Sequence, residues 1–118
     1  MRIAGKEYGF RYTVGAEEEL ARLCPGEDLR RIAELLRDMT PAGVRARAEF
    51  LCVLSRWDEK ARHFEDPEHV EQPLTMELLA LQPKAVFVEL QNEAFAAMAA
   101  DSKATVEAEP EKKDAAPK

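Results

Sequence analysis

The chain has 118 residues, the size of one domain, which excludes a second domain of enzyme size. It carries 17 Lys and Arg against 23 Asp and Glu, a formal net charge of −6, so we do not expect it to bind the phosphate backbone of a nucleic acid. Hydrophobic residues make up 46% of the chain, which is enough for a core that needs no disulfide or metal.

Residues 1–14 predict a short β-hairpin. Ile3 precedes a Gly5-Lys6 turn, and the residues after the turn alternate strictly between apolar side chains and small or polar ones. The apolar members of this pattern are Tyr8, Phe10, Tyr12 and Val14. Because an isolated two-stranded hairpin is only marginally stable in water, we expect helices to cover its aromatic face.

Two helices are expected next. The first runs from Ala16 to Cys24, with acidic residues near its positive start and a Pro25-Gly26 stop after it. The second opens after Asp28 and places five apolar residues on one face: Leu29, Ile32, Ala33, Leu36 and Met39.

A third helix begins with Thr40 as its N-cap and Pro41 in its first turn. Its first half is apolar on most sides, which predicts a buried helix at the centre of the domain. Beyond Trp57 only one apolar stripe continues, through Ala61 to Phe64. Charged residues are expected around this stripe: Asp58, Glu59, Lys60, Arg62 and His63. A helix of this length spans about 36 Å, so its end is expected to reach the margin of the domain.

Two more helices are predicted after an acidic loop over residues 65–73. A short one has Thr75 as its N-cap, and Pro83 starts the last one. Val88 and Phe95 stand apart from the main apolar stripe of this last helix, which predicts a small second contact surface.

Residues 101–118 contain one large apolar residue, Val106, and are expected to be a disordered polar tail. The sequence therefore predicts a mainly α fold. Residues 1–100 form a compact helical domain of about four to five helices with an N-terminal β-hairpin, and the tail follows it.

No catalytic or cofactor-binding pattern is present in the sequence. Ser55 and Ser102 lack the surroundings of an activated nucleophile, and no glycine-rich loop can hold a phosphate. His63 and His69 have acidic neighbours, but their spacing across Pro67 matches no zinc pattern and is typical of a solvated charged loop. We therefore expect no enzyme, no metal and no cofactor.

The cysteines and the hydropathy indicate the compartment. Cys24 and Cys52 each lie in an apolar periodic segment and are expected to be buried free thiols, as in a reducing cytoplasm. No stretch approaches the roughly 18 to 20 apolar residues of a membrane span, so no membrane partner is expected.

Two classes of binding protein remain open. Residues 29–57 superficially fit a helix-turn-helix that would place Arg45 and Arg47 at the start of a DNA-reading helix, although Glu49 and the net charge oppose DNA binding. The second class is a small regulatory or antitoxin-like protein, whose acidic tail becomes ordered on a basic partner.

The segment from Ile3 to Ala16 reads IAGKEYGFRYTVGA and leads directly into a Glu-rich helix. It resembles the start of tail assembly chaperones from long-tailed, siphovirus-like phages and prophages. The resemblance covers about the first 25 residues, and the rest matches only in architecture. It implies a non-enzymatic protein that binds the tape-measure protein, keeps it soluble and helps recruit tail tube subunits. It also implies a location in the host bacterial cytoplasm and absence from the mature virion.

A tape-measure protein exposes long apolar helical seams, which a small acidic helical protein can cover with an apolar groove inside a charged rim. We predict that this surface involves the apolar residues at the margins of the third and last helices. They are Trp57, Ala61, Phe64, Val88 and Phe95. Whether the protein also self-associates is left open by the sequence.

Overall fold

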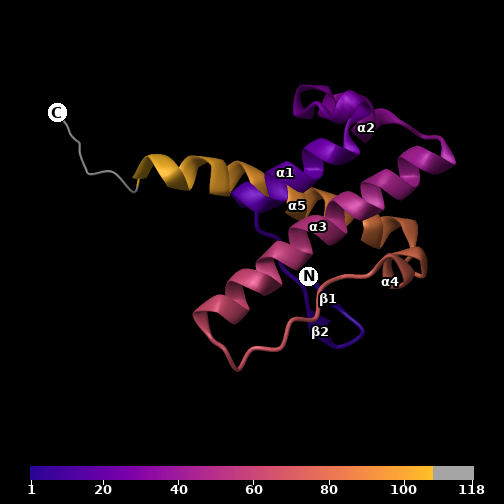
Figure 1. Ribbon diagram of the computed structural model, residues 1–118. Helices are drawn as coiled ribbons and strands as arrows, with labels where there is room; N and C mark the ends of the chain where they lie inside the picture. Colours follow the sequence, from indigo (N-terminus) through magenta and orange to yellow (C-terminus); the bar gives the residue numbers. More distant parts are fainter. Residues whose placement is uncertain (108–118) are drawn as a thin grey trace.

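The computed structural model describes residues 1–107, and it is mainly helical. Two short strands and two 3-10 turns accompany five α-helices (Figure 1). In chain order the elements are β1 (Arg2–Ile3), β2 (Lys6–Glu7), α1 (Val14–Leu23), η1 (Pro25–Glu27), η2 (Leu29–Arg31), α2 (Ile32–Arg37), α3 (Pro41–Glu65), α4 (Met76–Ala80) and α5 (Lys84–Glu107). The predicted fold class, a helical domain with an N-terminal hairpin, is confirmed.

The central helix α3 begins as the sequence predicts. The side chain of Thr40 accepts a hydrogen bond from the amide of Gly43 at 3.2 Å, and Pro41 occupies the first turn. Every residue from Phe50 to Ser55 is buried, so the middle of α3 is covered on all sides. Phe64 at the far end is 88% exposed, which confirms that the helix reaches the margin of the molecule.

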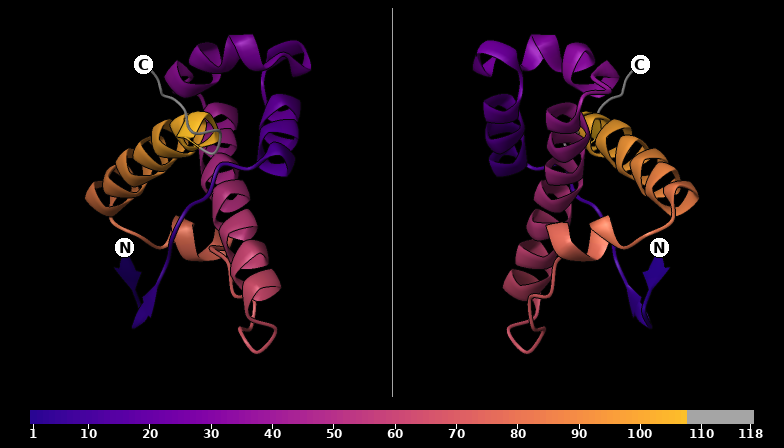
Figure 2. Two further views of the ribbon diagram at one scale, coloured as in Figure 1. Left: turned by 90° about the vertical axis from the view of Figure 1, so that its left-hand side faces the viewer. Right: turned by 90° about the vertical axis from the view of Figure 1, so that its right-hand side faces the viewer.

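The other helices flank α3 (Figure 2). α1 lies on one side of it, α4 and α5 lie on the other, and η1, η2 and α2 cross the end where α3 begins. The core consists of side chains from all of these layers, with α3 providing the largest share: Ile3, Ala16, Leu20, Ala48, Phe50, Leu51, Cys52, Val53, Leu54, Leu74, Leu79, Phe87, Leu90 and Ala94.

The hairpin is shorter than the alternating pattern predicts. Only Arg2↔Glu7 and Ile3↔Lys6 pair, and residues 8–13 continue as a single extended segment rather than as a strand. The reason is that this segment makes its backbone contacts with helices. The Arg11 amide donates to the carbonyl of Leu54 at 3.1 Å, and the Tyr12 amide donates to the carboxylate of Asp101 at 2.7 Å. Val14 already belongs to α1.

The predicted apolar face of the second helix is confirmed in part, because Leu29 and Ile32 pack against the core. Leu35 is its buried residue, whereas Ala33 and Met39 are exposed. The stripe begins in a 3-10 turn, η2, whose geometry advances the chain by three residues a turn instead of 3.6. The stripe read at α-helical spacing from Leu29 therefore drifts off the side that faces the core.

The last helix is longer than predicted, because α5 continues past Ala100 to Glu107. Alanine-rich sequence has a high helix propensity, and the contact between Asp101 and the Tyr12 amide ties this part of α5 to the extended segment. The tail is therefore not irregular from Asp101 onward. The rest of the predicted tail, residues 108–118, lies outside the described residues.

Candidate functional site

An apolar groove of about 800 Å³ lies where the first half of α3 meets α4 and the start of α5. Its lining is apolar over most of its surface. Twelve residues form it: Met39, Pro41, Val44, Arg45, Ala48, Met76, Glu77, Leu79, Ala80, Gln82, Lys84 and Phe87. Val44 is 43% exposed there and Met39 is 69% exposed, so the groove leaves large hydrophobic side chains in contact with water.

The groove exists because α4 is too short to cover α3. The helix begins with Thr75 as its N-cap, whose side chain accepts from the Leu78 amide at 3.1 Å, and it ends after five residues. Leu79 reaches the core, whereas Ala80 stays exposed. The apolar surface of α3 around Val44 is consequently left without a covering helix.

Charged residues stand at the edge of the groove. Among the side chains of residues 1–103, Arg45 of α3 and Lys84 of α5 form no ion pair with a carboxylate, and Glu77 forms none with a cation. Their charges are therefore available to a partner.

The predicted partner residues on α3 lie outside this groove. Trp57 is half-buried beside Gly15 of α1, and its indole nitrogen donates to a carboxylate oxygen of Glu19 at 2.9 Å. The ammonium of Lys60 lies 5.8 Å from the centre of its ring. Trp57 thus joins α3 to α1. Ala61 is half-buried, and Phe64 is almost fully exposed.

The predicted residues on α5, Val88 and Phe95, are 41% and 38% exposed. The ring of Phe95 packs against Phe50 of α3, with 5.9 Å between the ring centres. Phe95 therefore contributes to the contact between α3 and α5. No ring or polar contact described within residues 1–107 joins any two of the five predicted partner residues, so their role as one surface stays a prediction.

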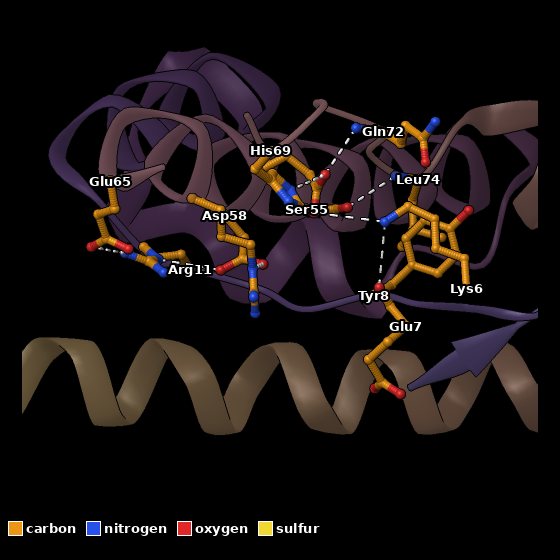
Figure 3. Close-up of polar contacts among 12 residues, drawn as sticks. Lys6, Glu7, Tyr8, Arg11, Ser55, Asp58, Glu65, His69, Gln72 and Leu74 are labelled. Carbon is orange, nitrogen blue, oxygen red and sulfur yellow. Dashed lines mark hydrogen bonds and ion pairs between the residues drawn. The ribbon is translucent and has the colours of Figure 1, made fainter. Parts of the chain in front are cut away.

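A second site, which sequence reasoning missed, is a buried acidic pair on α3 (Figure 3). Asp58 and Glu59 were expected among the exposed charges around the apolar stripe, but each is only 3% exposed. The expectation is wrong because two non-helical segments, 8–13 and 66–74, lie over this part of α3. The sequence does contain one signal for this burial, because the two adjacent acids follow a helical segment that is apolar on most sides. It does not identify the partners of these acids.

Glu59 holds the loop after α3 and the hairpin together. One of its carboxylate oxygens accepts from the Gln72 amide at 2.8 Å and meets the His69 ring at 2.9 Å, and the other lies 3.8 Å from the Lys6 ammonium. Burial alone would raise the pKa of Glu59, but these three donors outweigh it and lower the pKa. His63 contacts the carbonyl of His69 at 2.7 Å, so both histidines serve the loop.

Asp58 fixes the extended segment. Its carboxylate pairs with Arg11 at 3.2 Å and with Arg62, one turn later on α3, at 2.8 Å. Beside it, the Ser55 hydroxyl accepts from the Leu74 amide at 2.9 Å in a fully buried contact. Since both carboxylates are occupied by partners of the same chain, the cluster is suited to holding structure rather than to proton transfer.

The remaining candidate groups can also be placed. Arg47, assigned to DNA contact in a helix-turn-helix, is buried and donates to the backbone carbonyl of Asp38. Both predicted free thiols are buried, as expected. Burial raises the pKa of Cys52 to about 11, and it also raises that of Cys24. Within residues 1–107, no cluster of three or more His, Cys, Asp or Glu could hold a metal ion.

None of the helices in the described part of the chain combines the length and the apolar character needed to cross a membrane. Comparison of the chain with family models, with curated proteins and with solved structures gave no match.

Proposed function

We propose that this protein is a non-enzymatic tail assembly chaperone that binds apolar helical segments of a phage tape-measure protein. The observation that carries the proposal is the open apolar groove beside Val44, together with the N-terminal sequence resemblance. By the same resemblance, the protein acts in the host bacterial cytoplasm, helps recruit tail tube subunits and is absent from the mature virion.

The shape and the chemistry of the groove support this function. It is lined by three helices and by adaptable side chains such as Met39 and Met76. Amphipathic helices bind to such grooves with their apolar face, using anchors spaced three or four residues apart. A tape-measure protein offers many such faces, and covering them prevents aggregation.

The direct test is co-expression with the product of the adjacent long open reading frame, which the proposal expects to encode a tape-measure protein. We expect a larger soluble fraction of that protein after centrifugation, and co-purification of the two. Val44→Asp is expected to abolish the effect, because it places a charge in the apolar groove. Val88→Asp is the matched control, since Val88 is similarly exposed but lies on α5 outside the groove.

A tape-measure protein that stays insoluble beside the folded wild-type chaperone would contradict the proposed function. Loss of solubilisation with Val88→Asp but not with Val44→Asp would instead place the contact on the predicted surface around Val88 and Phe95. Circular dichroism of both variants must show wild-type helix content for either comparison to count.

A further inference from the structure

We propose that the groove selects a partner helix whose apolar stripe is flanked by acidic side chains. The inference rests on the proposed function, because it concerns the same groove, but it specifies the chemistry of the occupant. It is carried by the charges and one helix N-terminus at the groove.

Half of the lysines and arginines of residues 1–103 form an ion pair within the chain. Most arginines are already paired with carboxylates: Arg11, Arg22, Arg30, Arg31, Arg56 and Arg62. Arg45 and Lys84 have no such partner in this part of the chain, and both line the groove, where Glu77 is the one acidic residue. The edge of the groove thus carries a net positive charge on a protein whose formal net charge is −6.

The N-terminus of a helix adds to this positive potential. α3 starts at Pro41 and α5 at Lys84, both of which line the groove. Neither helix has an acidic residue in its first turn, whereas α1 has Glu17 there. At the start of α3, the Asp38 carboxylate accepts from the Thr40 amide at 2.9 Å and offsets the dipole, so the uncompensated positive end is that of α5, at Lys84. This positive potential would attract an acidic side chain on a bound helix and repel a basic one.

The chain's own C-terminal residues do not suit the groove. Residues 108–118 read AEPEKKDAAPK and contain no large apolar side chain that could fill it. A partner helix with Leu or similar anchors satisfies the apolar lining, and Asp or Glu beside those anchors satisfies the edge. The negative charge elsewhere on the protein would repel such a helix from other surfaces, which confines it to the groove.

Two fluorescein-labelled peptides test the inference by fluorescence anisotropy. Both have about 18 residues, or about 27 Å of helix, with the same Leu stripe. One has Glu beside the stripe and the other has Lys. We expect the Glu peptide to bind about three- to tenfold more tightly at low salt, with the difference shrinking as salt is added.

Variants of the protein test whether the preference for the Glu peptide arises in the groove. The double variant Arg45→Glu with Lys84→Glu should reverse the preference, and Val44→Asp should remove binding of both peptides. The control Val14→Asp, at an exposed valine of α1 outside the groove, should leave both affinities unchanged. Equal affinities, a preference for the Lys peptide, absence of binding to the wild type, or an equal loss with Val14→Asp would each overturn the inference.

The charge preference can fail separately from the proposed function. If the peptides bind alike while Val44→Asp still abolishes solubilisation of the tape-measure protein, the inference fails and the chaperone proposal stands. Light scattering tests whether a second copy of the chain fills the groove. A wild-type dimer that Val44→Asp converts to a monomer would show that a second copy fills the groove, and that result would also overturn the inference.

Discussion

Gly43 is required where the chain enters the central helix. A side chain at this buried position would overlap the backbone carbonyl and the side chain of Asp38. That carbonyl also accepts the buried guanidinium of Arg47, and the Asp38 carboxylate accepts from the Thr40 amide at 2.9 Å. One glycine thus allows a close contact that satisfies a buried charge and positions the helix cap.

We therefore expect Gly43→Ala to destabilise the protein by about 1–3 kcal/mol, because the added methyl group forces backbone atoms apart. Urea unfolding followed by circular dichroism measures the change. Ala42→Ser, at the exposed neighbouring position, is the control and should change stability by no more than about 0.5 kcal/mol. Equal stability of Gly43→Ala and the wild type would show that the joint between α2 and α3 can relax.

At the scale of elements, segments without regular structure are held by buried polar side chains of α3. The loop after α3 has few apolar residues, and its fixed points are the contacts of its backbone with Glu59 and Ser55. Such segments depend on individual hydrogen bonds more than helices do, because they have no internal ladder.

Ser55→Ala should accordingly cost about 1–3 kcal/mol, since it leaves the buried amide of Leu74 without its acceptor. Hydrogen exchange identifies the site of the effect. Relative to the wild type, the exchange rate should increase more at Leu74 and its neighbours than in α1. Uniformly faster exchange over the whole protein, with no local excess, would contradict a role specific to this loop.

At the scale of the whole molecule, the protein is thin. Its principal extents are 50 × 37 × 23 Å, and the smallest is about two helix diameters. A molecule of this thickness leaves part of most helices in contact with solvent. An apolar groove can therefore lie on its surface. Long charged side chains can also cover the buried carboxylates, as Lys6 covers Glu59 and as Arg11 and Arg62 cover Asp58.

The global stability should depend on pH through Glu59. Its pKa is lowered in the folded state from its ordinary value of 4.5, so its contribution to stability is complete above that pH. The contribution is lost as pH falls through the lower, folded-state pKa.

Glu59→Gln should therefore be less stable than the wild type by about 1–3 kcal/mol at neutral pH. The difference should shrink below about pH 4.5, where the wild-type carboxylate takes up a proton on unfolding. Urea unfolding of both proteins over this pH range measures the effect. A constant difference at every pH would mean that the loss comes from packing and not from the charge.

The sequence was sufficient for features that depend on local pattern. The Thr40-Pro41 start, the central position of α3 and the exposed Phe64 all follow from capping and periodicity within one helix. Features set by distant segments were not predictable. The burial of Asp58 depends on Arg11, 47 positions away, and the burial of Leu35 in place of Ala33 follows the 3-10 turn η2, which has no clear sequence signal.

The candidate site was likewise predictable only in part. An apolar groove with a charged rim was expected from the sequence, but its place was not, because it depends on how little of α3 the short helix α4 covers. Two of the predicted partner residues, Trp57 and Phe95, also contact other helices of the same chain. An amphipathic margin on one helix is equally typical of a contact with another helix of the same chain.

The burial of both thiols has a practical consequence for chemistry at the groove. Thiol-directed reagents need an accessible thiolate, and Cys52, with its pKa raised to about 11, is neither accessible nor ionised at neutral pH. Cys24 is also buried, and the sequence contains no third cysteine. A cysteine introduced at Val44 would therefore be modified selectively in the native, otherwise unaltered chain. A photocrosslinker attached there would covalently capture whatever helix occupies the groove, and mass spectrometry would then identify it.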